Sequence, residues 1–356
     1  MSKISILAHT SQTFAEAVHA VLGKGYVHAG LVYEEFFRQG RIQGRNPAFN
    51  NAQALLSDIL SLTDFSLPEL IDKRHDGKTG KFLLKTADQL EIETVLIPMQ
   101  SGGTLCVSSQ VGCRMGCAFC ETGRMGLLRN LTVEEVIRQV FVARHCLAFQ
   151  FRNVVFMGMG EPFDNYDAVM QAVRILNDPK GFALGRRHVS VSTSGCVEGI
   201  DRLIDEGEYA PNLAVSINAP NDALRNRLMP INRTHDLQRL HQAMQRYCAE
   251  TGREILIAYV LMKGQNDALD HADQLADYLQ GLAVKVNLIP YNAQSRDRFA
   301  APEPETLEAF AHRLRERGYY TLVRSTKGET IMAACGQLGN VKLRQQIRNG
   351  GLVHLH

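Results

Sequence analysis

Two hydrophobic patterns alternate along the chain after residue 100. Short apolar runs predict buried strands, and stretches in which apolar residues recur every three or four positions predict amphipathic helices. Strands are expected over residues 104–108, 153–157, 188–192, 212–217, 254–261 and 284–290. Helices are expected between them, over residues 132–146, 167–176, 197–206, 237–251 and 268–279. This order predicts an α/β fold with a parallel sheet.

Six strand–helix units of this kind predict an open or partial (β/α)6 barrel. In such folds the chemistry lies at the carboxyl ends of the strands. The segments that follow the predicted strands are rich in cysteine, glycine and polar residues, and they cover residues 113–120, 158–162, 192–195, 216–220 and 291–292. We therefore expect one site at that end of the sheet.

The chain before residue 90 follows a different pattern. Amphipathic helices are expected over residues 14–22, 30–39 and 52–62, and two strands, over residues 78–84 and 89–98, are expected to pair. We predict an N-terminal helical accessory module with a linker over residues 1–90, a core over residues 91–340 and a basic tail over residues 341–356.

The composition is typical of a packed globular protein, since 45% of the 356 residues are hydrophobic and 21% are charged. A formal net charge of +2 neither requires nor excludes a nucleic-acid partner. The chain has no signal-peptide pattern and no apolar run of about 18 residues, so we expect a cytoplasmic protein with no membrane partner. Its eight cysteines then indicate metal or redox chemistry rather than structural disulfides.

Cys113, Cys117 and Cys120 lie within eight residues. Gly112 and Gly116 permit the unusual backbone angles of a loop that wraps around a metal cluster. Three thiolates suffice for three irons of a [4Fe–4S] cluster and leave the fourth iron for S-adenosylmethionine (SAM), whose reductive cleavage gives a 5′-deoxyadenosyl radical. The alternative is a structural zinc site, which needs four ligands, and no second cysteine pair follows.

Further motifs follow in a fixed order along the chain. They read Cys106-Val-Ser-Ser-Gln-Val-Gly-Cys113, Gly158-Met-Gly-Glu-Pro162, Ser192-Thr-Ser-Gly195, Ala219-Pro-Asn-Asp222, Met229-Pro-Ile-Asn232, Asn287-Leu-Ile-Pro290 and Ala333-Ala-Cys-Gly-Gln-Leu338. Together they resemble the RlmN/Cfr family of radical SAM RNA methyltransferases, from about Glu91 to Leu338. The resemblance implies a partial (β/α)6 radical SAM barrel that methylates an adenosine carbon, C2 in preference to C8, in rRNA, tRNA or both.

The resemblance also implies roles for individual residues. Cys113, Cys117 and Cys120 would hold one [4Fe–4S] cluster. SAM would be bound by Gly160, Glu161, Ser192, Ser216, Ile217, Asn218 and Asn292. Asn218 stands where the family commonly has histidine, so we expect it to contact SAM through its backbone.

A second set of cysteines follows from the same resemblance. Cys335 matches the cysteine that is methylated first, because a thiolate accepts a methyl group from SAM where an adenine carbon does not. A second SAM yields the radical that joins the methyl carbon to the base. Glu93 would accept the ring proton, and attack by Cys106 on the Cys335 sulfur would release the product and leave a Cys106–Cys335 disulfide.

The implied partners are rRNA or tRNA, an electron donor such as flavodoxin or ferredoxin, and a disulfide reductant. We expect the protein itself to be a monomer. Phosphate contacts near the barrel mouth are predicted for Arg129, Arg186, Arg187, Arg225, Arg227, Arg324 and Lys327. Two other hypotheses stay open: the same methyl-cysteine chemistry on a non-ribosomal or small substrate, and a non-catalytic metal or RNA-binding module. The Cys335 motif argues against the module, because binding alone needs no reactive thiol.

Overall fold

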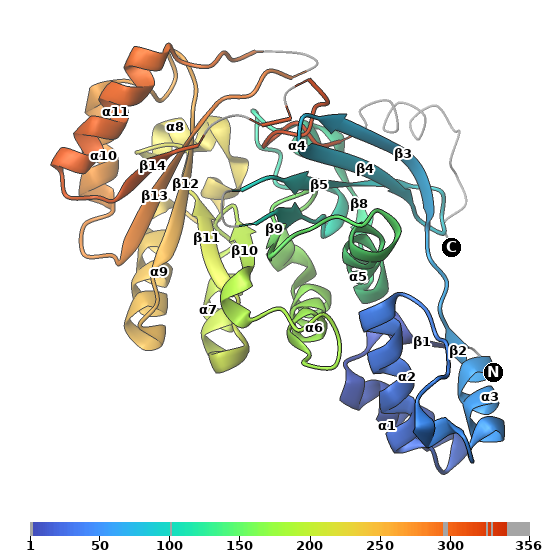
Figure 1. Ribbon diagram of the computed structural model, residues 1–356. Helices are drawn as coiled ribbons and strands as arrows, with labels where there is room; N and C mark the ends of the chain where they lie inside the picture. The colour runs from blue at the N-terminus through green and yellow to red at the C-terminus, as the bar shows by residue number, and fades with distance from the viewer. Residues whose placement is uncertain (1–2, 100–101, 295–297, 325–326, 329, 340–356) are drawn as a thin grey trace.

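The structure is a computed structural model that describes residues 3–99, 102–294, 298–324, 327–328 and 330–339 (Figure 1). The predicted basic tail over residues 341–356 lies outside the described residues. Within the described part of the chain, no helix is long and apolar enough to cross a membrane.

One large sheet organises the described residues, and its strands lie in the order β14-β13-β12-β11-β10-β9-β6-β5-β4-β3 (Figure 1). Its parallel part contains β6 (Thr104–Cys106), β9 (Asn153–Phe156), β10 (Val189–Thr193), β11 (Asn212–Ser216), β12 (Ile255–Leu261), β13 (Val284–Pro290) and β14 (Thr321–Val323). The six predicted strands are therefore confirmed, in parallel and in the predicted order. The short edge strand β14 was not predicted.

The sheet continues beyond β6 as an antiparallel extension. It contains β5 (Glu91–Ile97), β4 (Thr79–Lys85) and β3 (Glu69–Asp76). The predicted pairing of the two strands near residue 90 is confirmed by β4 and β5. Strand β3 was missed because its sequence, Glu-Leu-Ile-Asp-Lys-Arg-His-Asp, is mostly charged and largely exposed, so it shows no buried face.

Side chains alternate between the two faces of the parallel strands. In β10, Val189, Val191 and Thr193 are buried, whereas Ser190 and Ser192 are half-buried. The same alternation runs through all seven residues of β12. Since successive side chains of a strand point to opposite faces, one face of the sheet is packed and the other borders open space.

Helices cover the packed face of the parallel strands (Figure 1). They are α5 (Val133–Phe141) with the π-helical turn η3 (Val142–Cys146), α6 (Tyr166–Asn177), α7 (Val197–Asp205), α9 (Leu237–Thr251), α10 (Leu269–Tyr278) and α11 (Pro304–Glu316). All the predicted helices of the core are present within a few residues. Two short helices that follow strand ends, α4 (Glu121–Met125) and α8 (Asp222–Leu228), were not predicted, and neither was α11.

The N-terminal residues form a helical module beside α5 and α6 (Figure 1). It contains β1 (Ile4–Ser5), α1 (Ser11–Leu22), α2 (Tyr26–Gln39), α3 (Gln53–Leu62) and β2 (Thr63–Asp64). The rings of Phe36 and Phe141 stack at 4.6 Å, and Phe37 meets Phe182 edge-on at 5.1 Å. The three predicted helices are confirmed. The domain boundary at residue 90 stays a prediction. Strands β3 and β4, which precede residue 90, belong to the large sheet and not to the helical module.

A hairpin of β7 (Gln110–Cys113) and β8 (Gly126–Asn130) leads into the predicted cysteine loop. Gly112 has φ of +79°, and a Cβ atom there would lie 1.9 Å from the carbonyl oxygen of Gly126. Gly116 has φ of +65°. The left-handed backbone predicted for these two glycines is therefore confirmed, and at Gly112 the hairpin also requires the absence of a side chain.

We expect Gly112→Ala to lower the free energy of unfolding by about 3 kcal/mol or more, because backbone strain and a backbone clash add together. Gly77→Ala is the matched control: Gly77 has φ of +56° and nothing within 4 Å of its would-be Cβ. The control should lose only the strain, about 1–2 kcal/mol. Urea denaturation of both variants measures the difference, and equal losses would contradict the clash at Gly126.

Candidate active site

The carboxyl ends of the parallel strands surround one open cavity, whose empty volume, including the solvent at its mouth, is about 1090 Å³. Its floor is the half-buried face of the strands, with Ser192 from β10, Ser216 from β11 and Ala258 from β12. The predicted site residues that line it are Cys113, Cys117, Cys120, Gly160, Glu161, Ser192, Ser216, Asn218 and Cys335. Residues from six separate segments thus meet in one cavity, as the strand-end rule predicts.

Cys113, Cys117 and Cys120 form one wall of this cavity. Burial, and after it the neighbouring Cys120, raise the pKa of Cys117 to about 12. Burial also raises the pKa values of Cys113 and Cys120, so all three thiols are protonated until a metal displaces their protons. Within the described residues, no three His, Cys, Asp or Glu side chains converge as ligands of a single metal ion.

This arrangement fits a cluster better than a zinc ion. A structural zinc ion needs four ligands that converge on one point, whereas each thiolate of an iron–sulfur cluster binds a different iron. The three thiols line the same cavity and are close enough to influence one another electrostatically. The donor set on this wall is therefore suited to a [4Fe–4S] cluster with three protein ligands.

The glycine-rich segment after β9 fixes Glu161 in the wall beside the thiols. Gly160 has φ of +104°, and a Cβ atom there would lie 2.6 Å from Gln110. The buried Glu161 carboxylate accepts hydrogen bonds from the Ser194 amide and hydroxyl, both at 2.7 Å, and from the Phe163 amide at 3.2 Å. Burial raises the Glu161 pKa, and these bonds oppose the rise. The carboxylate thus reaches the cavity already held by three donors.

Asn218 is held more firmly than the sequence suggested. Its φ is +56°, its side-chain oxygen accepts from the Val260 amide at 2.7 Å, and its backbone carbonyl accepts from Asn266 at 2.8 Å. Its side-chain nitrogen lies 3.3 Å from the Met229 sulfur. The neighbouring Ile217 is fully buried and does not line the cavity. The side chains of both residues are therefore committed to the protein, and the contact of Asn218 with SAM through its backbone stays a prediction.

Arg225 was predicted to contact RNA, and this prediction is wrong. Its side chain is fully buried, and its guanidinium donates to the carbonyls of Ile217, Ser194 and Ser216 and to the Asn232 side chain, at 2.7–3.2 Å. Burial lowers its pKa. Arg225 therefore fixes the backbone at the ends of β10 and β11, directly behind the cavity.

Cys106 and Cys335, the two further cysteines that the family resemblance singles out, are close neighbours. Cys106 is buried at the end of β6, and Cys335 is half-buried between the large cavity and a smaller one that Asn292, Arg324 and Lys327 also line. Burial, and after it the nearby Cys335, raise the Cys106 pKa to about 12, while Arg324 opposes the rise. Cys106 is therefore a neutral thiol at pH 7 with a cation near it.

Asn292 lines the smaller cavity beside Cys335 and not the larger one. Its amide nitrogen donates to the Cys335 carbonyl at 3.0 Å. Its amide oxygen is buried and has no hydrogen-bond partner among the described residues. A buried acceptor without a partner destabilises a protein unless a ligand or water supplies a donor. Asn292 is thus placed to hold the Cys335 loop and to accept a hydrogen bond from a bound molecule.

Glu93 is buried on β5, on the same face of the sheet as Cys106. Val95 of β5 is the register partner of Cys106, and Glu93 precedes Val95 by two residues. The Glu93 carboxylate forms an ion pair with Lys81 of β4 at 2.6 Å. Lys81 was missed because nothing in the sequence distinguishes it from a surface lysine.

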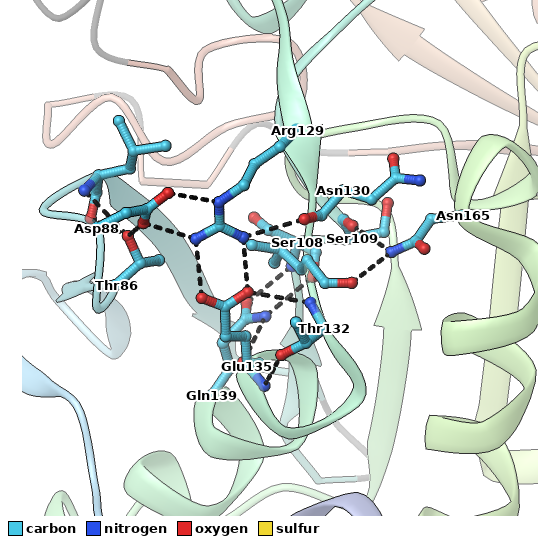
Figure 2. Close-up of polar contacts among 12 residues, drawn as sticks. Thr86, Asp88, Ser108, Ser109, Arg129, Asn130, Thr132, Glu135, Gln139 and Asn165 are labelled. Carbon is cyan, nitrogen blue, oxygen red and sulfur yellow. Dashed lines mark hydrogen bonds and ion pairs between the residues drawn. The ribbon is translucent and has the colours of Figure 1, made fainter. Parts of the chain in front are cut away.

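A polar network behind the cavity holds the loop that joins Cys106 to Cys113 (Figure 2). Gln139 of α5 accepts from the Ser108 amide at 2.8 Å and donates to the Ser108 carbonyl at 2.9 Å. Asn165 donates to the Ser109 carbonyl at 2.9 Å. Residues of the helix-covered face thus set the position of this loop, which carries one cysteine of each set.

Arg129 belongs to the same network and is not free to bind RNA (Figure 2). Its guanidinium lies between Asp88 and Glu135, with nitrogen–oxygen distances of 2.6 and 2.8 Å. Arg186 and Arg187 lie before β10, at the end of the sheet opposite the cavity. The predicted phosphate contacts of these three arginines at the cavity mouth are therefore wrong. The predicted phosphate contacts of three further residues stay a prediction: Arg227, Arg324 and Lys327.

Comparison with known proteins supports the same chemistry. The model of the radical SAM superfamily matches residues 107–278. A protein of Protochlamydia amoebophila named "Probable dual-specificity RNA methyltransferase RlmN 1" is 63% identical over 343 residues, which cover 96% of both chains. The "Dual-specificity RNA methyltransferase RlmN" of Halorhodospira halophila is 45% identical over 275 residues, which cover 76% of both chains. A crystal structure of a radical SAM methyltransferase from Sphaerobacter thermophilus matches with a TM-score of 0.87 and 39% identity, covering 94% of this chain and 98% of that one.

The Arg129–Asp88 pair predicts a pH dependence of stability. The hydrogen bond from Arg129 lowers the Asp88 pKa from 3.8 to about 2. A lowered carboxyl pKa stabilises the folded state above about pH 4, and this contribution is lost as the pH falls from about 4 to about 2. Because Asp88 is partly exposed, we expect about 1 kcal/mol rather than the full value of the shift.

Urea denaturation between pH 7 and pH 2 measures this contribution. Asp88→Asn should be less stable than the wild type at pH 7, and the two should converge as the pH falls towards 2. In an Arg129→Met background, which removes the donor, Asp88→Asn should have little further effect at any pH. A stability gap between wild type and Asp88→Asn that stays constant down to pH 2 would show that the pair does not act in this way.

Proposed function

This chain belongs to the RlmN-type RNA methyltransferases of the radical SAM superfamily, and we propose that it methylates an adenosine carbon through a methyl-cysteine intermediate, using two SAM molecules per turnover. The observation that carries the proposal is the place of Cys335. It lies in the wall of the cavity that holds the cysteine triplet and is also a close neighbour of Cys106. One sulfur can therefore serve both the methyl transfer and the release of the product.

The radical SAM family implies a [4Fe–4S] cluster and SAM. Cys113, Cys117 and Cys120 would hold the cluster on their wall of the cavity. The bound cluster would supply the electron that breaks a carbon–sulfur bond of SAM. The protein must then keep water away from the radical and present the methylated sulfur to it, which a half-buried Cys335 in the same cavity supports.

SAM would lie across the carboxyl ends of the strands. Its amino group faces a carboxylate if it approaches Glu161, which lines the cavity. The other proposed contacts are the backbone at Gly160, Ile217 and Asn218, the hydroxyls of Ser192 and Ser216, and the free amide oxygen of Asn292. Arg225 fixes the strand ends that offer several of these groups.

Cys335 would accept the methyl group as a thiolate. After the methyl carbon is joined to the base, Glu93 would take the ring proton. The unpaired electron of the coupled base would pass back to the cluster that supplied it. The Cys106 thiol would then lose its proton and attack the Cys335 sulfur, so that the sulfur–carbon bond breaks, the released carbon takes up a proton to complete the methyl group, and a Cys106–Cys335 disulfide forms. The sheet register supports this order, because it places Glu93 and Cys106 on one face, over which the Cys335 segment packs.

The RNA is proposed to be rRNA, tRNA or both. The relatives carry the name dual-specificity RNA methyltransferase, which supports an RNA substrate. The family resemblance implies that the branch acting at C2 also modifies tRNA. The target base must leave its stack to reach Cys335, as base-modifying enzymes require. Arg324 and Lys327 border the smaller cavity next to Cys335, so they are placed to meet the phosphates of such a flipped nucleotide. We expect a cytoplasmic monomer that is served by flavodoxin or ferredoxin and by a disulfide reductant.

The decisive experiment removes the releasing thiol. We expect Cys106→Ala, purified from cells or supplied with SAM and an electron donor, to carry RNA covalently bound to Cys335, because methylation and coupling proceed while release fails. Mass spectrometry of the protein shows the adduct, and sequencing of the trapped RNA identifies the substrate. Cys248→Ala is the matched control, since Cys248 lies away from the cavity and its sulfur donates to the Ala283 carbonyl. Wild-type protein that consumes SAM while no RNA is trapped or methylated would rule out the RNA assignment.

The high pKa of Cys106 predicts that release is faster at higher pH. The thiolate is the attacking form, so the release rate should rise about tenfold per pH unit below a pKa of about 12. Decay of a preformed adduct between pH 7 and pH 9 measures this rate without a contribution from RNA binding. Arg324→Gln should slow release at every pH in this range, because Arg324 lowers the Cys106 pKa. A rate that does not change with pH would assign the slow step to another group.

A further inference from the structure

Lys81 is a buried lysine at the centre of the antiparallel extension. Lys81 is the register partner of Val95, and Val95 is the register partner of Cys106. Directly paired residues of neighbouring strands point to the same face of a sheet. Lys81 and Cys106 therefore share one face with Glu93, and these three side chains come from three adjacent strands.

The contacts of Lys81 reach beyond Glu93. Its ammonium group lies 2.6 Å from Glu93 Oε2 and donates to the Met332 carbonyl at 3.0 Å. The other carboxylate oxygen of Glu93 accepts from the Gly339 amide at 3.3 Å. Met332 precedes Cys335 by three residues and Gly339 follows it by four. The Lys81–Glu93 pair therefore holds the segment that carries Cys335 on both sides of the thiol.

This pair differs from the other lysine ion pairs of the described residues. Its side chains are only 8% and 7% exposed. The other pairs are exposed or partly exposed, and they are Lys85–Glu69, Lys263–Glu303 and Lys285–Glu254. A buried ion pair contributes little net stability, because the loss of hydration offsets the attraction between the charges. A role in placing Glu93 explains why charges are kept here.

We propose that Lys81 is a positioning residue for the proton transfer in this reaction, an inference that rests on the proposed function. Lys81 fixes Oε2 of Glu93 while the Gly339 amide fixes Oε1, so the carboxylate cannot rotate away from the face that carries Cys106. Both oxygens keep a lone pair for an incoming proton. The ring carbon retains the electron pair of its carbon–hydrogen bond, Glu93 becomes a carboxylic acid, and Lys81 remains an ammonium ion.

The test separates proton removal from the earlier steps. Transcripts of 23S rRNA and tRNA are made with adenosine that carries deuterium at C2 and C8 or hydrogen at both. Wild type, Lys81→Met and Lys81→Arg are compared for Cys335 methylation, for 5′-deoxyadenosine formation and for methyladenosine. Lys85→Met is the matched control, a lysine of the same strand in an exposed ion pair.

We expect Lys81→Met to form methyladenosine about tenfold more slowly or worse, with a larger deuterium isotope effect than wild type. Cys335 methylation should stay close to the wild-type level, which also shows that the variant is folded. Lys81→Arg should restore part of the rate, and Lys85→Met should match the wild type in every measurement.

Three outcomes would overturn the inference in different ways. If Lys81→Met loses Cys335 methylation and methyladenosine in equal proportion with an unchanged isotope effect, Lys81 supports the fold and not the proton transfer. If Lys81→Met matches the wild type, it has no role in this step. If the wild type itself makes no methyladenosine, the proposed function fails, and the inference falls with it.

Discussion

The register between β4, β5 and β6 is the constraint on which the second half of the site depends. It places Lys81, Glu93 and Cys106 on one face of the sheet. A shift of one residue in either pairing would turn side chains to the helix-covered face, since neighbouring residues of a strand point to opposite sides. The opposite face of β5 is fixed independently, because Thr94 donates to Gln139 of α5 at 2.8 Å. The register is thus specified from both faces of the sheet.

The two halves of the site come from different parts of the sheet. The cysteine triplet and the proposed SAM contacts follow strands of the parallel part, where carboxyl ends converge for topological reasons. The thiol pair and Glu93 depend on the antiparallel extension and on the segment around Cys335. These halves meet because β6 belongs to both, pairing in parallel with β9 and in antiparallel with β5. Cys106 stands at the end of this shared strand and Cys113 follows it by seven residues.

Sequence patterns predicted the elements that show a buried apolar face. They failed for elements and side chains whose structure depends on a contact with a distant segment of the chain. The six predicted parallel strands carry apolar residues on the face that the helices cover, so their runs are visible in the sequence. Strand β3 is charged and exposed, and its existence depends on pairing with β4. The presence of a positive charge likewise did not reveal whether a side chain is exposed or buried. Arg225, Arg129 and Lys81 read as surface cations, yet each lies within a set of acceptors that the chain assembles from distant segments.

Burial of Cys106 has a consequence for the chemistry of the thiol pair. Two thiols that lie close together form a disulfide readily only when one of them is ionised, because the thiolate is the attacking species. The high pKa of Cys106 keeps it protonated at pH 7. Cys106 is therefore a poor nucleophile in the resting pair. In the proposed reaction it attacks once the Cys335 sulfur carries the base, and the nearby Arg324 favours the thiolate that the attack requires. Burial and Arg324 thus act in opposite directions on the thiol that releases the product.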